Sequence, residues 1–225
     1  METQTKYALL SSAYLAPVQY FTKLISYPEI YIETCESYLK QSYRNRAIIL
    51  TANGILQLSV PVGDGPRAKG SIKEIKISYD QPWQQMHWRG ISSAYNNSPF
   101  FEYYADDLAP FYQHKKWEFL IDFNLELLNT ILKSLRLKTD LKFTEDYHLA
   151  ANLPELCDDF RYSIHPKPQK QESDKHFSPM PYIQVFSEKW GFVPNLSILD
   201  LLFNEGPQSV SYLRSCIRDR AQNEE

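Results

Sequence analysis

His87 is the side chain best suited to acid–base chemistry. It lies four residues after Trp83 and four before Ile91, so on a helix it sits on or beside the apolar stripe. A neutral imidazole there can act as a general base or acid near pH 7. A core histidine tied to a carbonyl explains the same spacing. We take His87 as the candidate catalytic residue and keep both interpretations open.

A basic stretch offers a second kind of chemistry, the binding of an anion. It runs Lys40-Gln-Ser-Tyr-Arg44-Asn-Arg46. On a strand, Arg44 and Arg46 would point to one face, spaced to grip a phosphate or carboxylate, and Asn45 would point to the other. The alternative is a solvated strand edge whose charges discourage edge pairing.

Tyr14 and Tyr20 follow the first predicted strand, where the N–H groups that begin a helix suit an anion. The segment Ser11–Pro17 has no glycine, so a Gly-rich phosphate loop is not supported. The histidines and cysteines have no metal-ligand spacing. No Gly-x-Ser-x-Gly motif occurs. The sequence therefore predicts no metal and leaves any cofactor unknown.

Residues 179–206 carry strong helix signals. Asn195 and Ser197 are interpreted as caps, and Gly206 as the end of a helix. Gln184 and Asp200 are embedded among large apolar residues, and local capping does not explain them. We therefore count Asp200 among the candidate ligand-binding residues, and Asn195 joins them through the family resemblance described below.

Composition narrows the class of protein. The 225 residues carry a formal net charge of −3, so no basic field exists to hold nucleic acid. Three separated cysteines argue against a disulfide framework. No run approaches the roughly 20 apolar residues of a membrane span, and no signal peptide is evident. We expect a cytoplasmic protein.

The strands and helices that must position these groups predict an α/β fold. Strands at Tyr7–Leu10 and Ile30–Ile32 flank a helix at Val18–Ile25, which is a βαβ-like opening. Asn53-Gly54 predicts a β-hairpin. The expectation is a single domain, 1–217, with a mixed sheet flanked by several helices, a Pro-rich surface loop at 165–181 and a charged tail at 218–225. Further predicted elements are hairpin strands Tyr43–Thr51 and Ile55–Val62, strands Ile72–Ile77 and Lys142–Thr144, and helices from Gln81, at Phe100–Tyr112, Lys116–Leu137, Leu196–Phe203 and Gln208–Ile217.

Three segments together resemble one family. They are Ser12-Ala-Tyr-Leu-Ala-Pro-Val-Gln-Tyr-Phe21 with Tyr38–Arg46, His87-Trp-Arg-Gly-Ile-Ser-Ser-Ala-Tyr95 through Tyr104, and Gln184–Gly206. The chain is similar to the WbqC-like proteins, in the form found in Bacteroidetes. Many relatives carry His-x-x-Tyr-x-Pro, whereas Leu10–Ala13 has no histidine. The family-like positions are Tyr14, Pro17, Tyr20, Phe21, Lys40, Asn45, Arg46, Pro61, His87, Tyr95, Asn195, Leu196, Ser197 and Asp200.

The resemblance implies a role in bacterial surface-polysaccharide (O-antigen, lipopolysaccharide) biosynthesis. Our first hypothesis is a transferase-like step on an amino- or nucleotide-sugar intermediate, with a nucleotide sugar or an acyl donor as small-molecule partner. Lys40 and Arg46 would hold phosphate or carboxylate, His87 would be the general base, and Asn45 and Tyr95 would orient the substrate. The alternative is a non-catalytic binding or assembly protein of the same pathway, with 165–181 facing its partner.

Overall fold

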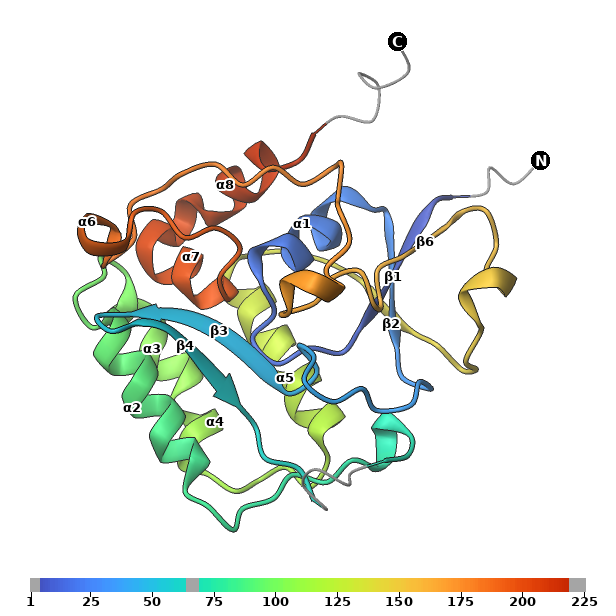
Figure 1. Ribbon diagram of the computed structural model, residues 1–225, viewed down its shortest axis with the longest axis horizontal. Helices are drawn as coiled ribbons and strands as arrows, with labels where there is room; N and C mark the ends of the chain where they lie inside the picture. The colour runs from blue at the N-terminus through green and yellow to red at the C-terminus, as the bar shows by residue number, and fades with distance from the viewer. Residues whose placement is uncertain (1–4, 64–68, 219–225) are drawn as a thin grey trace.

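Four short parallel strands form the central sheet of the computed structural model, which describes residues 5–63 and 69–218. The strand order is β5-β2-β1-β6, and the predicted charged tail lies almost wholly outside the described residues. A separate two-stranded antiparallel hairpin and several helices complete one α/β domain (Figure 1). The strands are β1 (Tyr7–Ser11), β2 (Glu29–Glu33), β5 (Leu141–Phe143) and β6 (Cys157–Asp159).

The βαβ opening predicted from the sequence is confirmed. Helix α1 (Val18–Ser26) connects β1 to β2, and Tyr7 pairs in register with Glu29. The helix ends at Tyr27, whose extended backbone is the conformation favoured before Pro28. Strand β6 then pairs with the other edge of β1. The direction of winding therefore reverses between β1 and β6, which makes this point a topological switch.

The two faces of the parallel sheet differ sharply. Ala8, Leu10, Ile30 and Ile32 are at most 1% exposed and share a core cluster with buried residues of α1 and α5 (Leu120–Ser134). The alternate residues point the other way, because successive side chains of a strand face opposite sides. On that side Figure 1 shows the yellow-to-gold loop between β5 and β6, residues 144–156, and no long helix.

The predicted hairpin is confirmed as β3 (Arg46–Thr51) and β4 (Gly54–Ser59). Gly54 has φ +99°, which the tight turn after Asn53 requires. Helix α2 (Trp83–Tyr95) packs on one face of the hairpin. The approach is close, because a Cβ added to Gly90 would lie 3.3 Å from Leu56 Cδ2.

The strand predicted at Ile72–Ile77 is wrong. Residues Ile72–Glu74 form a 3₁₀ turn, η2, whose first turn is capped by the Ser71 side chain. Ile72 and Ile75 are both buried, and their spacing of three matches the 3₁₀ period rather than strand alternation. Beyond that turn, Lys76 and Ile77 form only isolated bridges.

One helix prediction needs adjustment. The predicted helix Phe100–Tyr112 divides at Pro110 into α3 (Phe101–Leu108) and α4 (Pro110–Gln113), because proline has no N–H for a helical bond. Gly206 ends α7 (Ile198–Glu205) as predicted, with φ +50°. The remaining elements are η3 (Ala150–Asn152), η4 (Pro168–Lys170), α6 (Ser187–Trp190), η5 (Gly206–Gln208) and α8 (Ser209–Ser215).

Candidate functional site

Three polar residues end three neighbouring strands at one edge of the sheet. Ser11 is the last residue of β1, Glu33 of β2 and Asp159 of β6. The strands are parallel, so these side chains gather at the carboxyl edge and at the β1/β6 switch point. Open α/β sheets bind their ligands there.

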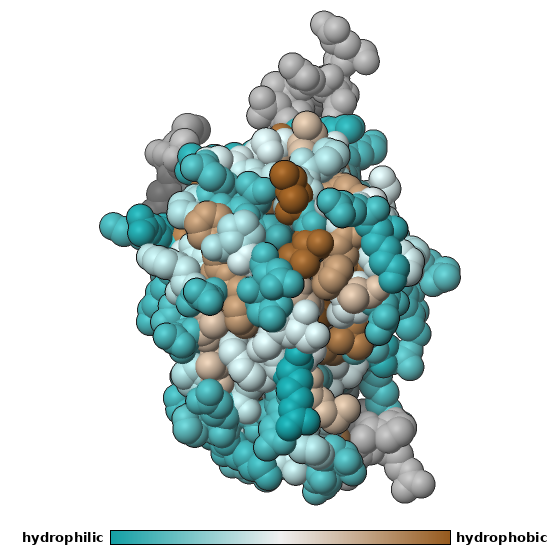
Figure 2. All heavy atoms as spheres, turned by 90° about the vertical axis from the view of Figure 1, so that its left-hand side faces the viewer, coloured by the Kyte–Doolittle hydropathy of each residue, from teal (hydrophilic) through white to brown (hydrophobic). Residues whose placement is uncertain are grey.

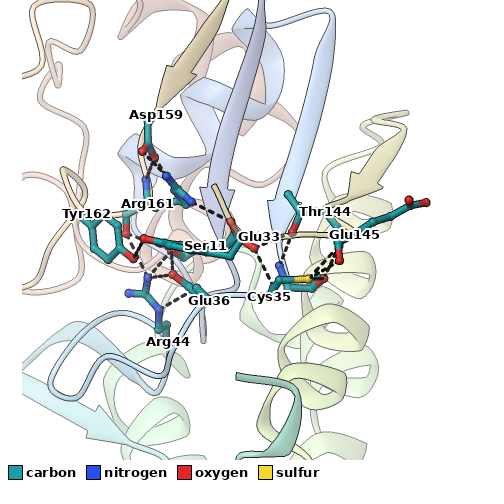
Figure 3. A network of polar contacts seen from close by, with 12 residues as sticks. Ser11, Glu33, Cys35, Glu36, Arg44, Thr144, Glu145, Asp159, Arg161 and Tyr162 are labelled. Carbon is teal, nitrogen blue, oxygen red and sulfur yellow. Dashed lines mark hydrogen bonds and ion pairs between the residues drawn. The ribbon is translucent and has the colours of Figure 1, made fainter. Parts of the chain in front are cut away.

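Arg161 joins two of these strand ends. It donates from Nη1 to Glu33 Oε2 at 2.9 Å, and it forms a forked pair with Asp159, with distances of 2.9 Å from Nε and 2.7 Å from Nη2 (Figure 3). Arg161 is 1% exposed and Glu33 is fully buried. Charges this deeply buried are tolerated when they are paired and hydrogen-bonded.

A second buried ion pair adjoins the first. Arg44 Nε donates to Glu36 Oε1 at 2.7 Å, and its Nη2 donates to Ser11 Oγ at 2.6 Å and also pairs with Glu36. Ser11 in turn donates to the Arg161 carbonyl at 3.0 Å. Burial raises the pKa of Glu36, although Arg44 opposes that effect. Tyr20 completes the cluster by donating to the Ser11 carbonyl at 3.0 Å.

Two tyrosines cover the arginines from the solvent side. Tyr147 lies over the Arg161 guanidinium, 4.9 Å from it, and Tyr162 lies 5.5 Å from that of Arg44. The two hydroxyls are 3.2 Å apart. Thr144, at the start of the 144–156 loop, donates to Glu33 Oε1 at 2.7 Å. The charged network therefore fastens this loop to the strand ends.

A cleft of about 970 Å³ lies over the helix-free face of the sheet. Its floor includes Tyr7 and Tyr31, whose ring centroids are 5.0 Å apart, and the 144–156 loop forms a wall. Glu33 belongs both to this cleft and to the buried network. The lining residues are Thr5, Tyr7, Leu9, Glu29, Tyr31, Glu33, Phe143, Thr144, Glu145, Asp146, His148, Leu153, Pro154 and Leu156.

His87 lies away from this cleft, in the contact between α2 and the core. Its Nδ1 is 2.9 Å from the Tyr14 hydroxyl, which is 2.9 Å from that of Tyr112. Burial lowers the pKa of His87 to about 4, despite a hydrogen bond to the Ser59 main chain that favours the protonated ring. The imidazole is therefore neutral at pH 7, and Tyr14 packs beside it.

The basic stretch does not form one binding surface. Arg44 precedes β3 and is buried against Glu36, whereas Arg46 Nη1 contacts Gln57 Oε1 at 3.3 Å. Arg46 and Gln57 lie on the hairpin face opposite the one that Gly90 of α2 contacts, so the structure does not bring Arg46 to His87.

The other two residues of this stretch have different surroundings. Asn45 donates to the Val60 carbonyl at 3.0 Å. Lys40 is half-buried in the connection between β2 and β3. The substrate-binding roles of Lys40, Asn45 and Arg46 stay predictions.

The remaining candidates hold the C-terminal segment in place. Asp200 is 1% exposed and accepts hydrogen bonds from Tyr95 at 3.0 Å, Tyr182 at 2.5 Å and Gln184 at 2.9 Å. Gln184 also bonds both main-chain groups of Val193. Burial raises the pKa of Asp200, and these three donors oppose that effect. The two polar residues that capping left unexplained are thus mutual partners.

Ser197 and Asn195 cap two different helices, α7 and α1. Ser197 accepts from the Leu199 N–H and caps α7, as predicted. Asn195 instead accepts the Gln19 N–H of α1 at 2.9 Å, so it caps a helix far away in the sequence.

The predicted surface segment 165–181 has little regular structure but is fastened to α1. Asp174 pairs with the buried Lys23 at 2.5 Å and accepts from Gln19 at 2.8 Å.

Within the described part of the chain, no group of His, Cys, Asp or Glu side chains has metal-binding geometry. None of the helices described there combines the length and apolarity that a bilayer span requires. The predicted cytoplasmic location stays a prediction.

The sequence reading missed most of the strand-end cluster. Glu33, Glu36, Asp159 and Arg161 were not candidates, since isolated charges far apart in the chain carry no motif. The one usable signal is Glu33, which directly follows the apolar residues of the predicted strand Ile30–Ile32.

Fold and site together define an α/β protein with a one-sided parallel sheet and a charged cluster at its carboxyl edge. The model of the WbqC-like protein family matches residues 12–212, so the chain belongs to the WbqC-like family. It is 32% identical over 229 residues to "Uncharacterized protein Rv1507c" of Mycobacterium tuberculosis, an alignment that covers 94% of this chain and 98% of that protein. No solved structure matches the chain. Its assignment to a Bacteroidetes form stays a prediction.

Proposed function

We propose that this protein is a transferase-like enzyme of bacterial surface-polysaccharide biosynthesis, acting on an amino- or nucleotide-sugar intermediate. Family membership supports the pathway. The observation that supports the substrate class is the cleft over the sheet. Its volume, about 970 Å³, falls within the range of small-molecule sites.

The lining of the cleft suits a sugar ring. Tyr7 and Tyr31 offer aromatic faces to the C–H groups of a ring. Glu29 places a carboxylate, which accepts hydrogen bonds from sugar hydroxyls, along the same floor. Glu33 is fully buried and accepts hydrogen bonds from Arg161 and Thr144, and these bonds fix the strand ends that shape the cleft.

Ligand binding by the Tyr31→Ala protein tests this proposal. A panel of nucleotide sugars, free sugars and acyl donors should include a compound that raises the melting temperature by several degrees, because a ligand at 100 times its Kd adds about 2.7 kcal/mol. Tyr31→Ala should remove the shift. Tyr103→Ala should not, since Tyr103 is 68% exposed on α3, outside the cleft. Silence across the panel, or equal loss in both variants, contradicts the proposal.

For the chemical step, the predicted general base His87 remains our second proposal. The neutral ring is linked through Tyr14 to Tyr112, which lines a separate cleft of about 310 Å³ with Gln84 and Lys115. A pKa of about 4 makes His87 a weak base. Folded His87→Gln protein that fully restores polysaccharide synthesis in a deletion strain would eliminate this role.

A non-catalytic assembly protein is the competing candidate, and an exposed apolar surface favours it. Figure 2 shows apolar side chains gathered in the upper half of one face. At the hairpin tip Ile55 is 57% and Leu56 36% exposed, and Trp190 packs over Gly54. If deleting 165–181 or substituting Trp190 abolished complementation while Tyr31→Ala did not, the assembly function would replace the enzymatic one.

A further inference from the structure

Nearly all charged side chains that line the cleft over the sheet are negative. Four carboxylates line it, and no lysine or arginine stands among the described residues of its lining. The only other titratable nitrogen of that lining is the imidazole of His148. An anion entering the cleft would meet like charges, which disfavour its binding.

Two of the four carboxylates form ion pairs with basic residues that do not line the cleft. Glu29 pairs with Lys142 at 3.0 Å, and Glu33 pairs with Arg161 at 2.9 Å. The side chains of Glu145 and Asp146 form no ion pair with any residue that the structure describes. These two negative charges at the loop wall therefore stay without a cation from the described chain.

Two described lysines lie close to the cleft without belonging to its lining. Lys142 Nζ lies 5.5 Å from the centroid of the Tyr31 ring, and its charge is already matched by Glu29 at 3.0 Å. Lys73 Nζ lies 3.4 Å from Cys35 Sγ, and that thiol contacts the main-chain carbonyl of Glu145 at 3.1 Å. Lys73 is not among the lining residues.

Aromatic and apolar side chains line the same cleft as these two charges. Tyr7 and Tyr31 form the floor, and Leu9, Phe143 and Leu156 continue it. A ligand that fits both parts has an apolar ring face and a positive group beside it. Aromatic rings also attract cations over their faces.

We propose that the cleft recognises a sugar carrying a free ammonium group, with Glu145 and Asp146 holding the ammonium and Tyr31 stacking on the ring. This rests on the proposed function and narrows it. Where the sugar is linked to a nucleotide, the sugar alone occupies the cleft, and the diphosphate lies outside the four carboxylates.

Glucosamine, N-acetylglucosamine and glucose form the decisive set, because they share a ring and differ in charge at one position. Binding is measured by titration calorimetry at pH 6.5 and low salt. Glucosamine should bind at least tenfold more tightly than the two neutral sugars. Raising the salt concentration should reduce that preference, because the contacts are exposed to solvent.

The double variant Glu145→Gln/Asp146→Asn should remove the preference and keep the fold, since both side chains are exposed. Glu155→Gln is the matched control, because Glu155 is exposed on the same loop but does not line the cleft. Equal binding of all three sugars, unchanged in the double variant, overturns the ammonium inference and leaves the sugar site standing. If none of the sugars binds and the wider panel is also silent, the proposed function falls with it.

Discussion

Lowering the pH should destabilise this protein through His87. The folded ring has a pKa of about 4, whereas an unfolded histidine titrates near 6.5. Between these values the unfolded chain binds a proton that the folded chain refuses, so stability falls as pH drops from 6.5 towards 4 and then levels off. At about 1.4 kcal/mol per pH unit, the loss amounts to about 3 kcal/mol.

Urea unfolding at several pH values between 7 and 4 measures this loss. Other groups titrate in the same range, so the quantity to compare is the free energy of unfolding of wild type minus that of His87→Gln. This difference should fall by about 3 kcal/mol over the range. His114→Gln is the control, because His114 is exposed and its loss should leave the wild-type curve unchanged.

Parallel curves for wild type and His87→Gln would refute the reasoning. They would mean that the folded ring protonates as easily as the unfolded one and is not desolvated between Tyr14 and the Ser59 main chain. A fall centred near pH 6.5 in catalytic activity, without a fall in stability, would instead favour His87 as an acid–base group in contact with solvent.

Two further substitutions test the packing of the site and of the C-terminal helices by urea unfolding. Arg161→Leu leaves Glu33 buried without its cation and should cost roughly 3–5 kcal/mol, of which a second change, Glu33→Gln, should restore part; no recovery would show that the buried charge is not the cause. Gly206→Ala should cost more than Gly191→Ala, because both positions have positive φ but only at Gly206 would the new Cβ lie 2.5 Å from the Phe100 ring. The Gly191 change should cost about 1 kcal/mol, and equal losses would contradict the steric argument.

Local patterns predicted the elements whose signals are local. Asn53-Gly54 specified the hairpin, and Pro28 marked the end of the first helix. Strand β6 escaped prediction because Cys157-Asp-Asp159 is short and polar, and only its pairing with β1 makes it a strand. The error at Ile72–Ile77 arose because the buried Ile75 and Ile77 have the two-residue spacing of a strand, whereas Ile72 and Ile75 have the spacing of a 3₁₀ turn.

The candidate site was less predictable than the fold. Ser11 and Arg161 are 150 positions apart and meet only after β6 pairs with β1. Arg44 belongs to the basic stretch that predicts an anion-binding surface. Its partner Glu36 lies outside that stretch, so the sequence does not reveal that the two form a buried ion pair. Gln184 and Asp200 were recognised as unexplained polar residues, and the tyrosines that satisfy them come from segments that sequence spacing could not connect.

The late position of β6 in the chain has a consequence for synthesis on the ribosome. Until residues 157–159 emerge from the ribosome, one edge of β1 is unpaired. Glu33 also lacks its ion-pair partner, because Arg161 lies later in the chain. An open strand edge on a growing chain invites pairing with other chains. A chain that terminates early therefore lacks the residues of the site and also keeps an edge that promotes aggregation. The emergence of residues 157–161 is thus the event that both completes the sheet and assembles the cluster.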